Sequence, residues 1–347
     1  MRRLVVPAAV LVVLAFVPKL SVDIPYAFKS ALNTPGTLQL LALCLVFGAV
    51  AMTYDLLFGY TGLLSFGHAL YFAVGVYIVD IAITRWHWSF AAALAFTALV
   101  GLVLPAILGA VSLRVGGIAF AMVTLAFAQA GSVLVFKNPY NWTGGEEGLG
   151  ADYTKLPQGL VGIFNTKHLY WVALVFAAAV FCVVEWAVHS SPGRVWQAIR
   201  ENELRVQVLG LRPYGYKLMV FVLASFLATA GGVVYLLLLG GATPEVTSPN
   251  FTLTLLVMVV IGGTGTRWGA FLGGALYTWA DQRLGDASAS HAVSSLPSVV
   301  RTPLQQPLFV LGVLFILVVF FVPGGLARIG RVRRPRTLQR LQEAMQR

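Results

Sequence analysis

Long, almost uninterrupted apolar runs recur along the chain, and they constrain its fold more than any other feature. A helix needs about 20 mostly apolar residues to cross a lipid bilayer. Ten segments meet or approach that length: Leu4–Leu20, Thr37–Leu56, Gly62–Thr84, Ser89–Val111, Val115–Phe136, His168–His189, Lys217–Gly240, Phe251–Thr264, Trp268–Gln282 and Leu304–Val322. We therefore expect an all-α polytopic bundle of about ten spans, with broken or re-entrant helices at the short eighth and ninth segments.

The composition excludes a water-soluble globular protein. Of the 347 residues, 58% are hydrophobic and only 11% are charged, whereas about 25% of the residues of a soluble domain are charged. A disordered chain needs the opposite balance. Cys44 and Cys182 each lie inside an apolar run, and the five histidines are scattered. Neither set has the spacing of a metal site, so we expect no metal in this chain.

The N-terminus begins with two arginines and continues as the first apolar run. This start resembles a signal peptide, but no Ala-x-Ala cleavage site follows Val17. Because the rest of the chain is equally apolar, we expect the run to remain as the first membrane span.

The lysines and arginines that flank the spans predict the orientation, because cytoplasmic flanks carry more of them. With both termini inside, 16 of the 24 Lys and Arg residues lie in inner flanks. Residues 1–327 then form the membrane domain, with an outer loop over 137–167 and an inner loop over 190–216. The basic tail, residues 328–347, is expected near anionic headgroups rather than on nucleic acid.

The inner loop predicts a short amphipathic helix. Ser191 is placed to cap the helix and Gly210 to end it, so that it covers residues 193–209. Glu201 and Arg205 have the i,i+4 spacing of a helical ion pair. The apolar residues that share one helical face are Val195, Ile199, Val206 and Leu209. Such a helix either lies on the membrane surface or docks onto a soluble partner.

A glycine-rich break separates the second and third apolar runs. The polar residues around its glycines are Tyr60, Thr61, Ser65 and His68. Each residue alone is typical of close helix packing. The segment as a whole predicts exposed carbonyl and hydroxyl groups along a polar path for a zwitterionic solute.

Six stretches, in collinear order over roughly residues 37–327, resemble the branched-chain amino-acid ABC transporter permeases of the LivM type. These stretches are YDLLFGYTGLLSFGHA (54–69), GIAFAMVTLAF (117–127), TGGEEGL (143–149), SPGRVWQAIRENE (191–203), GGTGTRWG (262–269) and FVPGGL (321–326). The chain departs from the family pattern at Ala119, where Tyr is usual, at Ala270, where Pro is common, and at Val206 and Gln207.

The resemblance implies a multi-pass subunit of an ATP-binding-cassette importer in the bacterial inner membrane, with no catalytic residues or cofactor of its own. Its partners would be a second homologous permease, two cytoplasmic ATPase subunits that bind ATP and magnesium, and a periplasmic solute-binding protein. The cytoplasmic helix would transmit closure of the ATPases, and the residues implied in this coupling are Arg194, Arg200, Glu201, Asn202, Glu203 and Gly210. Glu146 and Glu147 are either solvated or contact the binding protein. The sequence contains no GxxxxGK[ST] phosphate loop, so ATP must bind elsewhere.

The substrate class expected from the resemblance is branched-chain or related small amino acids, with urea, short amides or other amino acids as alternatives. An ion-coupled secondary transporter needs acids buried at mid-membrane, and the two acids that could serve, Asp80 and Glu185, lie near span ends. A membrane enzyme needs a catalytic constellation, for which the sequence offers only His68 with Ser65. A sugar-type ABC permease is expected to carry different motifs.

Overall fold

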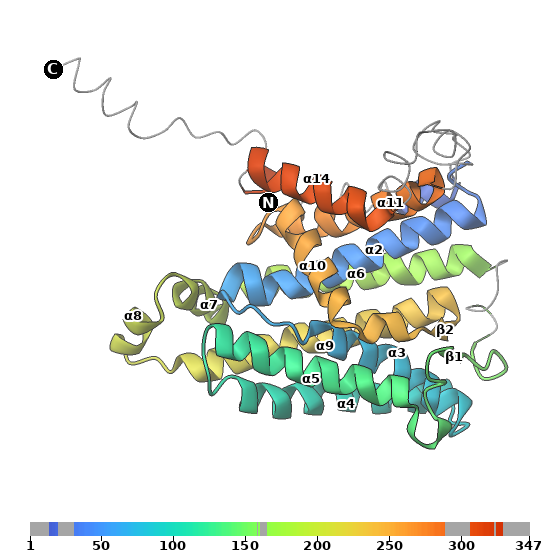
Figure 1. The fold of residues 1–347 in the computed structure, drawn as a ribbon, viewed down its shortest axis with the longest axis horizontal. Coiled ribbons are helices and arrows are strands. Elements are labelled where there is room, and N and C mark those ends of the chain that lie inside the picture. Colours follow the sequence, from blue (N-terminus) through green and yellow to red (C-terminus); the bar gives the residue numbers. More distant parts are fainter. Residues whose placement is uncertain are drawn as a thin grey trace, which may run out of the picture.

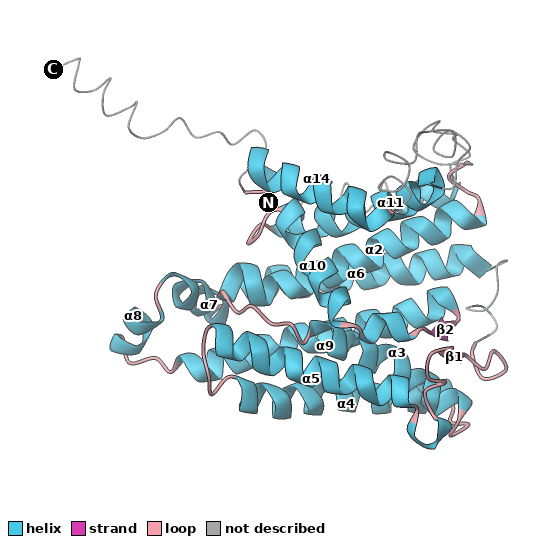
Figure 2. Ribbon diagram, viewed as in Figure 1, coloured by secondary structure: helices cyan, strands magenta, loops and turns pink. Residues whose placement is uncertain are grey.

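The computed structural model describes residues 14–19, 31–157, 159, 165–288, 306–322 and 324–328. These residues form helices that run side by side, as Figure 1 and Figure 2 show. The helices are α2 (Pro35–Asp55), α3 (His68–Thr84), α4 (Phe90–Ser112), α5 (Ile118–Lys137), α6 (Thr166–His189), α7 (Ser191–Glu201), α8 (Glu203–Val208), α9 (Pro213–Leu239), α10 (Pro249–Gly262), α11 (Arg267–Ser288) and α14 (Pro307–Phe321). Two short strands, β1 (Leu149–Gly150) and β2 (Gly241–Ala242), pair antiparallel. The predicted all-α membrane class is confirmed.

Nine of the ten expected spans coincide with helices of the described residues, and the first, Leu4–Leu20, lies largely outside them. Five helices are long and apolar enough to cross a bilayer, namely α2 with its continuation to Thr61, α4, α5, α6 and α9. The apolar parts of α3, α10 and α14 are shorter. The count of ten spans therefore stays a prediction.

The boundary between the second and third expected spans was wrong. The helix of α2 continues beyond Leu56 as a π-helical turn, η2 (Leu56–Thr61), and α3 begins only at His68. Gly62, at φ +77°, takes the left-handed conformation that ends the turn. Residues 62–67 are not helical, so the glycine-rich break is a true interruption of the helix.

The core forms around α2 and α3, whose backbones approach their neighbours closely. On α2, Ala42, Val46 and Val50 are completely buried. A Cβ atom at Gly75 of α3 would collide with the carbonyl oxygen of Thr229 on α9, and one at Gly232 with the carbonyl oxygen of Phe72. Small residues at such crossings allow the van der Waals contact on which helix association in lipid depends.

Two groups of connections lie at opposite ends of the bundle (Figure 1). At one end, α7 and α8 project beyond the long helices, next to the α4–α5 turn and the start of α9. There, Tyr214 Oη of α9 donates a hydrogen bond to the carbonyl oxygen of Ala110 on α4 at 2.8 Å. At the other end lie β1, β2 and the loop after α5. The expected outer and inner loops are thus on opposite sides, while their assignment to periplasm and cytoplasm stays a prediction.

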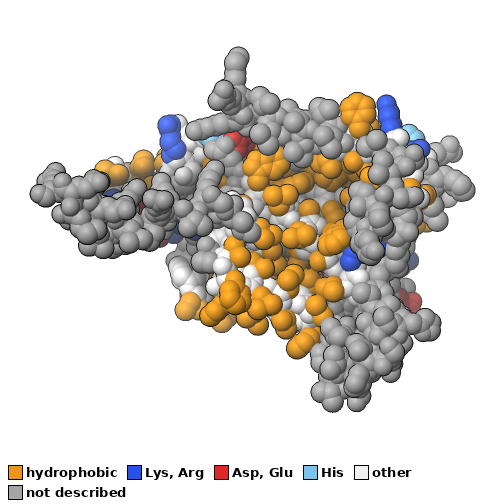
Figure 3. All heavy atoms as spheres, turned by 90° about the horizontal axis from the view of Figure 1, so that it is seen from above, with side chains coloured by type: hydrophobic (Ala, Val, Ile, Leu, Met, Phe, Trp, Pro, Cys, Tyr) orange, Lys and Arg blue, Asp and Glu red, His pale blue; other side chains and the backbone are white. Residues whose placement is uncertain are grey.

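The surface fits a lipid environment. In the space-filling view of Figure 3, hydrophobic side chains fill the middle of the face, and lysines and arginines lie to either side. Large apolar residues are exposed along α4, among them Leu99, Val103 and Ile107. Trp86 packs edge-on against Trp142 at the end that carries β1, as expected of aromatic residues at a membrane–water interface.

The close crossing of α3 and α9 predicts different effects of one substitution at two glycines of α9. We expect Gly232→Ala to lower the stability of the detergent-solubilised protein by about 1–3 kcal/mol, because the added methyl group forces the two backbones apart. Gly215→Ala is the matched control, since a Cβ atom there meets no neighbour within 4 Å. Thermal unfolding measures both variants, and equal unfolding temperatures would contradict the packing described here.

Candidate functional site

The helix predicted over residues 193–209 is two helices in the structure. Asn202, with φ −163° and ψ 104°, is extended and separates α7 from α8. Its side-chain oxygen accepts a hydrogen bond from the backbone N–H of Arg205 at 3.0 Å, so that Asn202 caps the start of α8. The cap of α7 is Ser190 and not Ser191, because Ser190 Oγ accepts the N–H of Gly193 at 3.2 Å. Gly210, at φ +82°, lies just beyond the end of α8, as expected.

The break at Asn202 also changes which apolar residues are buried. Ile199 and Val206 are buried as predicted, but Leu209 is exposed. The largest buried side chain of this segment is that of Trp196, which was not predicted from the sequence to be buried. Its side chain is buried, and its Nε1–H donates to the carbonyl oxygen of Tyr216 at 2.9 Å. One face of α7 is therefore fixed to the start of α9.

The ion pair predicted between Glu201 and Arg205 is not among the ion pairs of the described residues. The helical i,i+4 geometry that it requires is lost where Asn202 interrupts the helix. Instead, Glu203 accepts a hydrogen bond from Lys217 Nζ at 2.6 Å, which fastens the start of α8 to α9.

Three of the residues exposed on α8 and its C-cap are large and apolar. Leu204, Val208 and Leu209 are 71%, 87% and 74% exposed, respectively; we call these three residues the α8 patch. Arg194 and Glu201 of α7 and its C-cap Asn202 are exposed as well. A cluster of large exposed apolar side chains on a polar loop is typical of a surface that another protein covers.

Arg200 connects α7 to the membrane helices. Its Nη1 group donates a hydrogen bond to the carbonyl oxygen of Gly59, within the π-helical turn η2. Beside it, the Asp55 carboxylate accepts the backbone N–H of Gly265, at 2.9 Å to Oδ1 and 3.2 Å to Oδ2. Three segments that lie far apart in the sequence thus meet at one point: the end of α2, the inner loop and the α10–α11 turn.

Asp55 was not recognised as a site residue from the sequence. It is only 2% exposed, and an acid inside an apolar run is itself a signal that was available, because buried carboxylates in membrane spans need a partner. Asp80, placed near a span end by the sequence, is completely buried, and its Oδ1 accepts a hydrogen bond from Thr84 at 3.0 Å.

The four residues predicted along a polar path are buried within this chain. Thr61 Oγ1 donates to the carbonyl oxygen of Leu56 at 2.9 Å, and His68 Nε2 lies 2.9 Å from Thr53 Oγ1. Ser65 is buried and accepts the N–H of Gly67, and Tyr60 is buried as well. Their role in a path stays a prediction.

The non-helical segment 62–67 is held inside the bundle by two threonines. Thr124 of α5 accepts the backbone N–H of Phe66 at 3.0 Å. Thr252 of α10 donates to the carbonyl oxygen of Phe66 at 3.1 Å and accepts the N–H of Ala69 at 3.0 Å. Irregular backbone at membrane depth needs such partners, because lipid supplies none.

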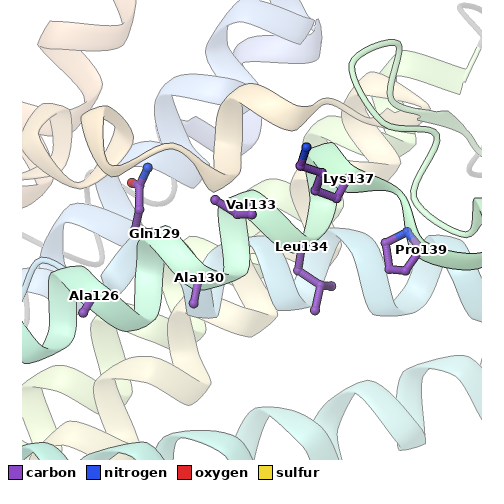
Figure 4. A pocket seen from close by; sticks show the side chains of 7 residues that line it. All are labelled: Ala126, Gln129, Ala130, Val133, Leu134, Lys137 and Pro139. Carbon is purple, nitrogen blue, oxygen red and sulfur yellow. The ribbon is translucent and has the colours of Figure 1, made fainter.

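An open groove of about 710 Å³ runs along the exposed face of α5 (Figure 4). It is lined by Ala126, Gln129, Ala130, Val133, Leu134, Lys137 and Pro139. Gln129 lies in the middle part of this apolar helix and is exposed. The face therefore combines small residues with a polar amide, unlike the large apolar face of α4.

Glu146 and Glu147 are both exposed, on the loop that leads to β1. Asn138 holds the start of this loop: its side-chain oxygen accepts the N–H of Thr143 at 2.9 Å and of Gly144 at 3.2 Å. The two acids are thus accessible, as the expected contact with a binding protein requires, and that contact stays a prediction.

Comparisons with known proteins identify the family of the chain. A family model described as branched-chain amino acid transport system / permease component matches residues 36–319. The high-affinity branched-chain amino acid transport system permease protein LivM of Escherichia coli (strain K12) is 24% identical over 318 residues, covering 85% of this chain and 71% of the relative. The protein of the same name from Salmonella typhimurium is 23% identical with the same coverage. The probable branched-chain amino acid transport permease protein LivM of Methanocaldococcus jannaschii is 26% identical over 157 residues, or 45% of each chain.

No solved structure matches the chain. The matched range of the family model begins at the start of α2 and ends within α14. It therefore includes η2, the segment 62–67, α7, α8 and the α10–α11 turn, which together make up the contacts described above. The chain belongs to the family of branched-chain amino acid transport system permease components.

Proposed function

We propose that this chain is one membrane-spanning subunit of an ATP-binding-cassette importer for branched-chain or closely related small amino acids, and that it works by alternating access. The observation that carries the proposal is the α8 patch, three large apolar side chains exposed on a loop that is itself fastened to the membrane helices. ATP and magnesium bind to two partner ATPase subunits, and a solute-binding protein delivers the substrate at the opposite end, where Glu146 and Glu147 are exposed.

In this proposal, the α8 patch docks onto an ATPase subunit. The residues that couple its movement to the membrane helices are Arg194, Arg200, Glu201, Asn202, Glu203 and Gly210. Arg200 reaches η2 and Glu203 binds Lys217 of α9, so a displacement of α8 is passed to helices on both sides of α7. Asn202 and Gly210 set the angles at which α8 leaves α7 and returns to α9.

In this proposal, the groove face of α5 lies on the substrate path, opposite a second, homologous permease subunit. An amide exposed to lipid at mid-membrane is unfavourable, because hydrocarbon supplies no hydrogen-bond partner. Gln129 and Lys137 extend from the same side of α5 (Figure 4), so the groove offers polar groups to a protein surface or to a passing solute. The purely apolar exposed face of α4 instead suits lipid.

Tyr60, Thr61, Ser65 and His68 belong to the moving wall of the path in this proposal. They are buried in the present conformation, and they reach a solute only when the segment 62–67 shifts between the threonines that hold it. Alternating access supplies that shift, since the two access states expose different sides of the same segment.

An ion-coupled secondary transporter is the second candidate, and the complete burial of Asp80 in α3 favours it. Proteoliposome uptake separates the two candidates. The importer requires ATP, the ATPase subunits and the binding protein for the uptake of leucine, isoleucine or valine. Uptake by this chain alone, driven by an ion gradient, would contradict the proposal, and uptake of urea or a short amide by the complete complex would correct the substrate class.

A charge in the α8 patch should disrupt docking of the ATPase subunits. We expect Val208→Asp to weaken their association by about tenfold or more, because a carboxylate buried in an apolar contact is poorly compensated. Co-purification and a titration of the ATPase subunits measure the change. Tyr140→Asp is the control, because Tyr140 is equally exposed but lies at the other end of the bundle. Unchanged association of the Val208→Asp variant would contradict docking at the α8 patch.

Loss of the amide on α5 should slow transport without affecting assembly with the ATPases. We expect Gln129→Leu to reduce uptake by about tenfold, the effect of one lost hydrogen bond in a low-dielectric site. Leu102→Ala, on the exposed face of α4, is expected to leave uptake unchanged. If the Gln129→Leu variant transports at the normal rate, α5 does not face the path.

A further inference from the structure

Asp55 occupies a position that packing alone does not explain. It is the last residue of α2 and is 2% exposed, between apolar residues on both sides in the sequence. Burying a carboxylate is unfavourable unless donors surround it. The donor here comes from a distant part of the chain, since both carboxylate oxygens accept the N–H of Gly265, 210 residues away.

Arg200 supplies the positive charge next to this carboxylate. Its guanidinium makes no ion pair with Asp55 among the described residues, and it meets the acid at the shared glycines instead. It lies against both glycines of the contact: Nη1 donates to the carbonyl oxygen of Gly59, and a Cβ atom at Gly265 would be 2.8 Å from Nη1. A residue of α7, Arg200, and a residue of the α10–α11 turn, Gly265, therefore both lie near the buried Asp55.

Two glycines make this approach possible. A Cβ atom at Gly59 would collide with Asp55 Oδ1, and it would lie 2.5 Å from the backbone nitrogen of Gly265. Gly265 itself has φ +68°, a left-handed conformation that other residues adopt at a cost. The backbone is thus shaped to bring the carboxylate and the N–H group together.

The α10–α11 turn also lies in contact with the segment after α14. Thr266 Oγ1 donates to the carbonyl oxygen of Gly263 at 2.5 Å. A Cβ atom at Gly263 would lie 2.6 Å from the carbonyl oxygen of Gly324, which follows α14. A movement of Gly265 therefore reaches α10, α11 and the segment after α14.

The attachments of α7 differ in kind. At the start of α9 it is held by the buried ring of Trp196. At η2 it is held by the hydrogen bond from the Arg200 guanidinium to the carbonyl oxygen of Gly59, close to Asp55. An apolar attachment beside a hydrogen-bonded one that can open is the arrangement expected of a hinge with a latch.

We propose that Asp55 and Arg200 form a latch that joins α7 to the end of α2 and to the α10–α11 turn, and that the movement of the ATPase subunits reaches the membrane helices through it. Asp55 is then a positioning residue of coupling that acts through Arg200 and Gly265. This inference rests on the proposed function, because it names the membrane-side receiver of the same movement.

The test measures the number of substrate molecules imported per ATP hydrolysed, using the complete complex in proteoliposomes with its binding protein and leucine. We expect Asp55→Asn and Arg200→Gln each to lower this ratio by at least about fivefold. The double variant should be no worse than either single variant, because both open the same junction between α7, η2 and the α10–α11 turn. A smaller amount of folded complex lowers uptake and hydrolysis equally, so a purely structural defect leaves the ratio unchanged.

Asp80→Asn is the matched control, because Asp80 is an equally buried acid toward the opposite end of the bundle, bonded to Thr84; its ratio should stay normal. A normal ratio in the Asp55→Asn variant would overturn the latch. If that variant fails to assemble, Arg200→Gln decides, since Arg200 is an exposed residue, and a normal ratio there would overturn it as well. A wild-type complex without ATP-driven uptake would instead refute the proposed function.

Discussion

Hydrocarbon offers no hydrogen-bond partner to a peptide group, and this constraint explains where the chain departs from regular helices. Residues 62–67 leave helical conformation between α2 and α3, yet Thr124 and Thr252 satisfy the backbone on either side of Phe66. The carboxylate of Asp55 does the same for the N–H of Gly265 in the α10–α11 turn. Each interruption is closed by a side chain from another helix, so the interruptions hold the bundle together as well as breaking its helices.

The interruptions at the α7 end connect the membrane to the inner loop. The π-helical turn η2, the α10–α11 turn and α7 meet around Asp55 and Arg200, while the α8 patch faces outward from the same loop. A partner that binds the patch therefore acts on a segment with rigid contacts behind it. This arrangement suits a permease that receives mechanical work from another subunit, and the family match is consistent with such a division of labour.

The length of the apolar runs predicted most helices, because a span must bury its backbone over a fixed distance. Local chemistry was less decisive. Ser190 and Ser191 are the same residue type, so the sequence does not show which of them caps α7. Nothing in the sequence marks Asn202 as the residue that ends α7 and caps α8. The partner of Asp55 was beyond sequence reasoning, since a contact between residues 210 positions apart depends on how the helices pack. The motifs of the inner loop and of the glycine-rich turns nevertheless pointed to the segments that meet there.

The central claim is that movement of the ATPase subunits reaches the membrane helices through α7 and α8. Hydrogen–deuterium exchange on the assembled complex tests this claim. The backbone amides of residues 203–211 are to be compared with and without the ATPase subunits. The account predicts that these amides become protected when the subunits bind, while the amides of the loop 142–150 at the other end do not change. Unaltered exchange at 203–211, with protection appearing elsewhere on the chain, would contradict it.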